Sequence, residues 1–184
     1  MQVTGAARTN AAVRFIANAG AACIDGIELE ATALPLLGLE VSLAGSYLDA
    51  KLRENQVNAD LTAPGLKGDR IANVPEYSAS LAVEYGRPLG AALQGSVRTD
   101  FSYVGETASE FRPTSVFFER IDAYTLTNLR LRLSNAEATW NVDLYVDNVF
   151  DEVAIGRVLS SPFGFDLTLS APPRTIGMGF SVKL

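Results

Sequence analysis

Apolar and polar residues alternate along most of the chain with a period of two, which is typical of β-strands with one apolar and one polar face. The stretch "PPRTIGMGFSVKL" at residues 172–184 shows the pattern well, because every second residue from Ile176 to Leu184 is apolar. Helical periodicity is nearly absent, and the alternation predicts about eight strands. The predicted strands are 11–18, 24–34, 38–51, 75–86, 91–105, 121–134, 139–150 and 174–184.

The predicted strands and their connections differ from those of a compact soluble domain. Several strands exceed the usual length of about 5–6 residues and match the roughly 9–11 residues that a tilted strand needs to cross a bilayer. Tight turns at 35–38, 86–90 and 134–138 alternate with long links at 52–74, 106–120 and 151–173. Tight turns on one side of a sheet and long loops on the other are typical of outer-membrane barrels.

The two faces of the predicted strands differ in chemistry. The polar face carries many charges at strand centres: Glu28, Glu30, Glu40, Glu84, Arg98, Asp100, Arg130, Arg132, Asp143, Asp147 and Lys183. The apolar face holds aromatic residues at two levels, with Tyr47, Tyr77, Phe101 and Tyr103 at the long-loop ends and Tyr85 and Trp140 at the short-turn ends. Because membrane interfaces favour such rings, we expect this face to contact lipid through Leu29, Leu43, Leu81, Val97, Leu131, Leu144 and Phe180. A soluble β-sandwich would show the same alternation with its apolar face toward a core.

Composition narrows the function classes. The formal net charge of −6 argues against nucleic-acid binding, which needs a basic surface. The chain has no His and one Cys, Cys23, so it lacks the usual zinc ligands, an internal disulfide and a Ser-His triad. Glu28 and Glu30 share a face, as catalytic carboxylates can, but ordinary lumen charges explain them better. We therefore expect neither an enzyme nor a cofactor or metal site, and no transmembrane helix, since no run of about 18 apolar residues occurs.

Three segments resemble TonB-dependent outer-membrane receptors. The stretch "NAGAACIDGIELEATALPLLGLEVSLAGSYLDAKL" at residues 18–52 is similar to a recurrent stretch of that family, with an Asn-Ala-Gly loop, a Gly-Ile-Glu-Leu-Glu strand, a Pro-containing turn and a strand ending in Tyr and Asp-Ala. "VDNVFDE" at 146–152 resembles the Asn-Leu-Phe-Asp segment near the family's C-terminus. "PPRTIGMGFSVKL" resembles the closing strand, although the family usually ends in an aromatic residue and this chain ends in Leu184.

The resemblance implies an all-β fold: an antiparallel up-and-down transmembrane β-barrel segment of about eight strands, without a plug domain. Residues 1–184 would form the C-terminal portion of a barrel that has about 22 strands in the whole receptor. The implied protein lies in the outer membrane of a Gram-negative bacterium and takes up iron-siderophore or similar nutrients, and this fragment is not active alone. Its implied partners are outer-membrane lipid, the remaining barrel and plug, TonB through that plug, and an iron chelate or other small nutrient.

The resemblance also places ligand contacts in loops, where aromatic and Arg side chains would bind an anionic chelate. The candidates are Phe111, Arg112, Phe117, Phe118 and Arg120 in one loop and Arg157, Phe163 and Phe165 in another. These residues could equally pack the loops against each other. Two other functions stay open: a small closed outer-membrane barrel, formed if 11–18 pairs with 174–184, and a soluble β-sheet binding module.

Overall fold

The computed structural model describes residues 2–6, 14–18, 20–56, 63–160 and 166–183. These residues form strands, turns and loops. The strands are β1 (Gln2–Ala6), β2 (Arg14–Asn18), β3 (Ala22–Leu36), β4 (Leu39–Leu52), β5 (Tyr77–Pro88), β6 (Leu93–Val104), β7 (Thr107–Ala108), β8 (Arg120–Ile121), β9 (Tyr124–Asn135), β10 (Trp140–Asp147), β11 (Ile155–Ser160), β12 (Asp166–Ser170) and β13 (Thr175–Val182). In this part of the chain we find no helix that is long and apolar enough to cross a membrane.

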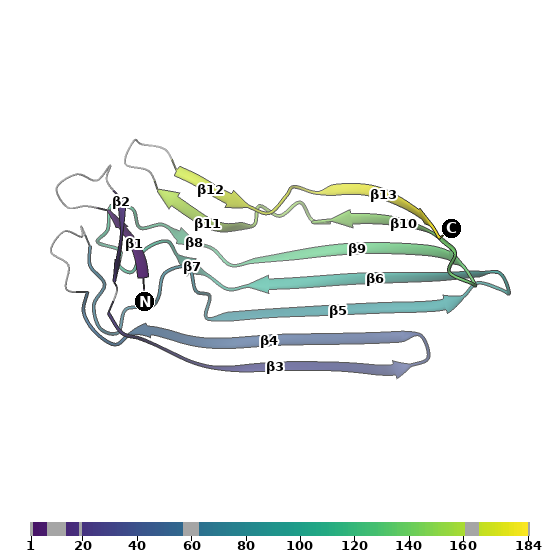
Figure 1. The fold of residues 1–184 in the computed structure, drawn as a ribbon, viewed down its shortest axis with the longest axis horizontal. Coiled ribbons are helices and arrows are strands. Elements are labelled where there is room, and N and C mark those ends of the chain that lie inside the picture. Colours follow the sequence, from purple (N-terminus) through teal and green to yellow (C-terminus); the bar gives the residue numbers. More distant parts are fainter. Residues whose placement is uncertain (1, 7–13, 19, 57–62, 161–165, 184) are drawn as a thin grey trace.

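Seven long strands form one antiparallel sheet in the spatial order β13–β10–β9–β6–β5–β4–β3 (Figure 1). Strands that are consecutive along the sheet-forming part of the chain pair with each other, as in an up-and-down barrel. β3 and β13 are the two edges, so the sheet is open. The predicted all-β antiparallel architecture is confirmed, and the seven predicted strands from 24–34 to 174–184 all lie in this sheet.

The first predicted strand, 11–18, does not join the sheet. Its described part, β2, pairs with β1 in a separate two-stranded hairpin, with Gln2 opposite Asn18 and Ala6 opposite Arg14. Pairing with a nearby segment costs less loop-closure entropy than pairing with the far end of the chain. The closed small barrel, which needed 11–18 against 174–184, is therefore not formed.

The turns and the long links lie at opposite ends of the sheet (Figure 1). The tight turns use residues with positive φ, among them Gly38 at 82° and Gly90 at 85°, which suits glycine because it has no Cβ. The Asn135 side chain closes the third turn by accepting hydrogen bonds from the backbone N–H groups of Thr139 and Trp140. Two of the three long links form the short hairpins β7–β8 and β11–β12, which the alternation pattern did not predict.

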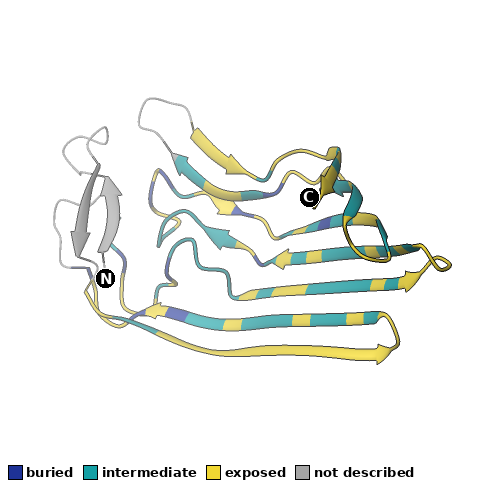
Figure 2. Cartoon of the chain, turned by 45° about the vertical axis from the view of Figure 1, so that its right-hand side comes forward, coloured by how far each residue is buried: buried dark blue, intermediate teal, exposed yellow. Residues whose placement is uncertain are grey.

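Burial is concentrated at the long-loop end of the sheet (Figure 2). The buried apolar side chains are Ala50, Leu52, Ile71, Phe117, Ile121 and Ala154. The middle of the sheet buries neither face against the described part of the chain. A soluble sandwich would instead cover its apolar face, and the exposed fractions of Leu29 (59%), Leu144 (47%) and Phe180 (69%) are large for leucine and phenylalanine in a soluble domain.

Candidate functional site

One face of the sheet is a continuous apolar surface. The strand registers align one row of apolar and aromatic residues across all seven strands, since each member pairs with the next. The row consists of Leu36, Leu39, Tyr85, Val97, Leu131, Leu144 and Met178. The same registers bring the seven residues predicted to face lipid to this one face, which we call the apolar face.

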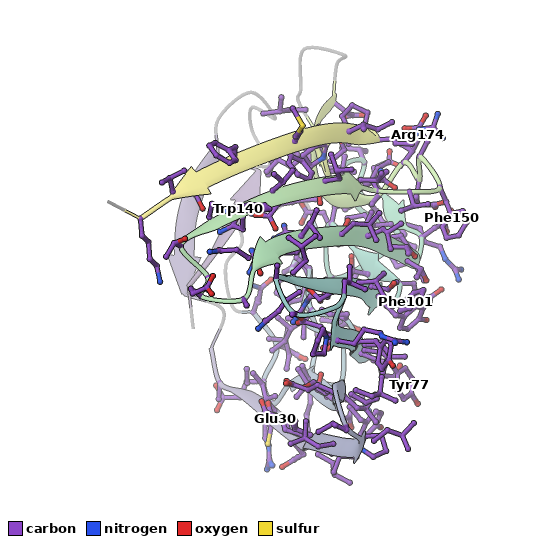
Figure 3. The ribbon with its side chains drawn as sticks, turned by 90° about the vertical axis from the view of Figure 1, so that its right-hand side faces the viewer. Glu30, Tyr77, Phe101, Trp140, Phe150 and Arg174 are labelled. Carbon is purple, nitrogen blue, oxygen red and sulfur yellow. The ribbon has the colours of Figure 1, made fainter. Side chains whose placement is uncertain are left out.

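Aromatic rings gather at the long-loop end of the apolar face. Tyr47 and Tyr77 are opposite each other on β4 and β5, and their ring centroids are 5.2 Å apart with a tilt of 38°. Figure 3 shows Tyr77 and Phe101 on one side of the sheet and Glu30 on the other. Phe101 lies nearer the middle of the strands than predicted, because it pairs with Leu81 and not with Tyr77. At the opposite end Tyr85 lies on the same face. The arrangement matches the two aromatic girdles of transmembrane barrels.

The opposite, polar face carries a cluster of charged side chains over β5, β6, β9 and β10. The Arg98 guanidinium bridges two carboxylates, with N–O distances of 2.7 Å to Asp100 and 3.4 Å to Glu84. The Arg132 guanidinium lies 2.6 Å from the Asp143 carboxylate. These groups line a hollow of about 540 Å³ together with Ser96, Asn128 and Arg130. Because the cluster is polar and partly exposed, this face suits an aqueous lumen.

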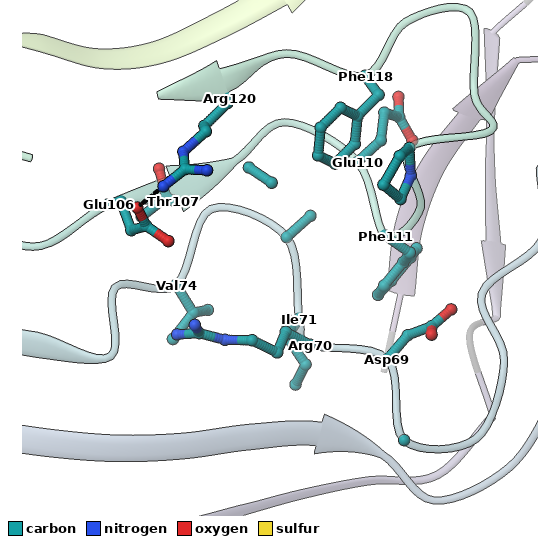
Figure 4. Close-up of a pocket in the computed structure, with 14 residues that line it drawn as sticks. Asp69, Arg70, Ile71, Val74, Glu106, Thr107, Glu110, Phe111, Phe118 and Arg120 are labelled. Carbon is teal, nitrogen blue, oxygen red and sulfur yellow. Dashed lines mark hydrogen bonds and ion pairs between the residues drawn. The ribbon is translucent and has the colours of Figure 1, made fainter. Parts of the chain in front are cut away.

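A pocket of about 370 Å³, which we call the loop pocket, opens at the long-loop end of the sheet, between the link that precedes β5 and the β7–β8 hairpin (Figure 4). Ile71, Val74, Phe111 and Phe118 supply apolar surface, and Arg70, Glu106 and Arg120 supply charge. The two segments are joined directly, because the Asn73 N–H donates to the Ala108 carbonyl at 2.8 Å. The pocket lining therefore combines apolar side chains with a few charged groups, which is usual for a small-molecule site.

Every cation at this pocket already has a carboxylate partner. Arg120 pairs with Glu106, Arg70 with Glu76 at 2.9 Å, and Arg112 with Asp69 at 3.7 Å. A bound anion would have to share or displace these carboxylates. All three arginines keep exposed side chains, so such an exchange costs little more than a surface ion pair, about 0–1 kcal/mol.

The structure separates the predicted ligand residues into groups. Phe111, Phe118 and Arg120 line the pocket, and Arg112 lies beside it through its ion pair with Asp69. Phe117 is buried, with only 6% of its surface exposed, in a loop that the Ser109 hydroxyl closes by donating to the Phe117 carbonyl. Arg157 lies on β11, outside this pocket, and forms no ion pair with any described residue. The remaining two candidates, Phe163 and Phe165, lie outside the described residues.

The segment "VDNVFDE" has a structural role that the alternation pattern could not reveal. Asn148, buried and with a φ of 52°, donates from its side chain to the carbonyls of Glu152 and Pro172 and accepts from the Glu152 N–H. The Asp151 carboxylate accepts a hydrogen bond from the Arg174 N–H at 2.8 Å. These bonds fix the link between β10 and β13 at both of its ends, because Asn148 follows β10 and Arg174 precedes β13.

No group of three or more potential metal ligands occurs in the part of the chain that the structure describes. Of the residues that line the loop pocket, sequence reasoning missed Arg70, Ile71, Val74 and Glu106. Arg70, Ile71 and Val74 come from the link 52–74 and Glu106 from the link 106–120, and only the folded arrangement of these two links brings them together.

Comparison with known proteins agrees with this architecture. The crystal structure of the ferric yersiniabactin uptake receptor FyuA from Yersinia pestis is similar, with a TM-score of 0.70 and 21% sequence identity. The match covers 91% of this chain and 24% of that receptor, so the chain spans about a quarter of the receptor's length. Residues 2–149 match the family described as TonB dependent receptor-like, beta-barrel. The chain therefore belongs to the TonB-dependent receptors, a family of outer-membrane transporters of Gram-negative bacteria and not of enzymes, and it forms part of their β-barrel.

Proposed function

We propose that residues 1–184 form the C-terminal portion of the barrel of a receptor that imports an iron-siderophore complex or a similar scarce nutrient. The two-faced open sheet is the observation that carries this proposal, because an open edge at β3 and another at β13 need further strands on both sides. In this arrangement β13 is the closing strand of the barrel and pairs with its first strand. The chain alone would not transport, because the plug through which TonB acts belongs to the rest of the receptor.

The apolar face contacts lipid in this proposal. Leu29, Leu43, Leu81, Val97, Leu131, Leu144 and Phe180 then lie in the hydrocarbon region, and the rings of Tyr47, Tyr77 and Tyr85 lie at its two boundaries. Support comes from the absence of any cover over these side chains in the described residues and from the continuity of the apolar row across seven strands. The polar face then lines the lumen, where water and the plug surround its charges.

The loop pocket is the proposed ligand contact. Phe111 and Phe118 offer aromatic surface to a ligand, and Arg120 and Arg112 offer guanidinium groups to its anionic oxygens. Arg157 on β11 remains a proposed ligand contact, as do Phe163 and Phe165, which lie outside the described residues. The similar structure, the ferric yersiniabactin uptake receptor FyuA, supports an iron chelate as the cargo only through its similar fold.

The test is ligand binding and uptake by the full receptor after replacement of Phe111, Phe118 and Arg120 by Ala. We expect weaker binding of a panel of ferric siderophores and loss of uptake, with unchanged amounts of folded receptor in the membrane. Val116→Ala is the matched control, because Val116 lies in the same loop and is 79% exposed outside the pocket. Unchanged binding in the triple variant would show that the pocket does not bind the ligand. A receptor that takes up none of the tested chelates would contradict the proposal that its cargo is an iron chelate.

A further inference from the structure

The loop pocket carries more negative than positive charge. The charged residues that line it are two arginines, Arg70 and Arg120, and three acids, Asp69, Glu106 and Glu110. The ion-pair partners just outside the lining, Glu76 and Arg112, add one charge of each sign. The pocket and these partners therefore hold four carboxylates and three guanidinium groups. A surplus of negative charge weakens the binding of a ligand with several negative charges.

The ion pair between Arg120 and Glu106 is the most exposed of the three pairs at the pocket, with 66% and 53% of the two side chains exposed (Figure 4). A ligand that binds Arg120 through an anionic oxygen displaces Glu106 and leaves that carboxylate without a cation. A ligand that also carries a cationic group gives Glu106 a new partner, so that every charge stays paired. The exchange therefore favours a ligand with an anionic oxygen and a cationic group.

The aromatic part of the lining favours the same cationic group. Phe111 and Phe118 both line the pocket, and the faces of aromatic rings attract organic ammonium groups. Asp69 and Glu110 line the same pocket and attract the same charge. A ligand that is negative throughout gains none of these contacts.

We propose that Glu106, together with Asp69 and Glu110, selects a ferric chelate that carries a protonated amine and has no net negative charge. A ferric trihydroxamate with a free amino group is such a chelate, because three hydroxamates balance the charge of Fe³⁺ and the ammonium group adds a positive charge. Its hydroxamate oxygens pair with Arg120, and its ammonium group pairs with Glu106. A ferric tris-catecholate is a trianion and offers the surplus carboxylates no cation. This inference rests on the proposed function, because it takes an iron chelate as the cargo and the loop pocket as its contact.

The binding of three ferric chelates to the full receptor tests this selection. The first is a ferric trihydroxamate with a free amine, the second is the same chelate with its amine acetylated, and the third is a ferric tris-catecholate. Dissociation constants are measured by equilibrium dialysis with radiolabelled iron, for the unmodified receptor and for the Glu106→Gln and Glu119→Gln variants. Glu119→Gln is the matched control, because Glu119 precedes Arg120 in the chain, is exposed and lies outside the pocket lining.

We expect the unmodified receptor to bind the amine-bearing chelate about five- to tenfold more tightly than the acetylated form, as one exposed ion pair and one cation–π contact together imply. The tris-catecholate should bind more weakly than both. In Glu106→Gln the preference for the amine should fall to about twofold, and the tris-catecholate should bind more tightly than it does to the unmodified receptor, because Arg120 has lost its carboxylate partner. Glu119→Gln should keep the preference of the unmodified receptor.

Equal binding of the amine-bearing and acetylated chelates, or a tris-catecholate that binds as tightly as either, would overturn the inference and leave the iron-chelate cargo standing. A folded Glu106→Gln variant that keeps the full preference for the amine would do the same. The comparison of the three chelates on the unmodified receptor needs no variant, so it decides the question even where Glu106→Gln does not fold. A receptor that binds none of the three chelates would contradict the proposed cargo, and this inference with it.

Discussion

Leu81 offers the sharpest test of the proposal that the apolar face contacts lipid. It lies midway between Tyr77 and Tyr85 on β5, four residues from each ring. Four residues span about 14 Å of strand, or roughly 10 Å of membrane depth at a tilt near 45°. The two tyrosines would therefore mark the boundaries of the apolar band, and Leu81 would lie close to the bilayer midplane.

The perturbation is Leu81→Arg, which puts a guanidinium among the side chains of Leu43 and Phe101, its neighbours across the sheet. An Arg on the lipid face near the midplane costs about 2–4 kcal/mol of folding free energy. The matched control is Ala82→Arg, one residue further along the same strand. Ala82 lies on the polar face opposite Asp100, so its replacement should change stability by only about 0–1 kcal/mol.

The assay is equilibrium unfolding of the full receptor in liposomes, with denaturant titrations of the unmodified protein, L81R and A82R. We expect the midpoint to fall clearly for L81R and to stay near that of the unmodified protein for A82R. Equal losses in the two variants, or a larger loss in A82R, would refute the assignment of the faces. Leu131→Arg is a weaker test than L81R, because the registers align Leu131 through Val97 with Tyr85, at a boundary of the apolar band. Asn128 is also a poor control for it, because the Asn128 side chain accepts a hydrogen bond from the Asn148 N–H.

Three further predictions concern packing and hydrogen bonds. A Cβ at Gly177 would overlap the ring of the half-exposed Tyr145, which must turn away from its present rotamer. Gly177→Ala should therefore cost about 0.5–1.5 kcal/mol in the same unfolding assay, and the same change should cost less in a Tyr145→Ala background. Gly179→Ala is its control, because the nearest atom to that Cβ would be 3.9 Å away, and equal losses at both glycines would contradict the explanation. Asn148→Ala should cost about 1–3 kcal/mol of folding free energy for each buried group left without a partner, and it should make the 148–174 link easier to cut with proteases. The control is Asn141→Ala, which loses one exposed hydrogen bond to Ser181 and should leave both the stability and the protease resistance nearly unchanged. Phe117→Ala should destabilise its loop by about 3–5 kcal/mol, which should appear as faster proteolysis of that loop, while Val116→Ala should leave the loop intact. If the Phe117→Ala receptor resists proteolysis as well as the unmodified receptor, the ring does not stabilise the loop.

The strands and their faces could be predicted from the sequence because a period of two is a local signal. Each strand from β3 to β6 shows it over ten or more residues, and consecutive strands joined by tight turns must be antiparallel neighbours. The edge strands of the sheet, and the fact that the sheet is open, could not be predicted, because the alternation in residues 11–18 does not indicate which strand they pair with. Only the structure shows that β2 pairs with β1 instead of β13.

The candidate site could likewise be predicted from the sequence only in part. Phe111, Phe118 and Arg120 were found because aromatic and Arg residues gather in one link, but that signal also selected Phe117, which packs inside the loop. The opposition of Arg98 and Arg130 depends on the register across the long link between β6 and β9, and no local pattern fixes that register. The αL conformation and hydrogen bonds of Asn148 likewise depend on residues as distant as Pro172.

The most direct test of the central claim is a site-directed spin-label scan along β5, from Ser78 to Glu84, in the full receptor in liposomes. Cys23, the single cysteine of this chain, is first replaced by Ser. Collision rates with oxygen, which partitions into lipid, and with a water-soluble nickel complex are measured at each position. We predict alternation with a period of two, with Ala79, Leu81 and Val83 more accessible to oxygen and Ser78, Ser80, Ala82 and Glu84 more accessible to nickel. Uniform accessibility, or alternation with the opposite phase, would contradict a barrel whose apolar face contacts lipid.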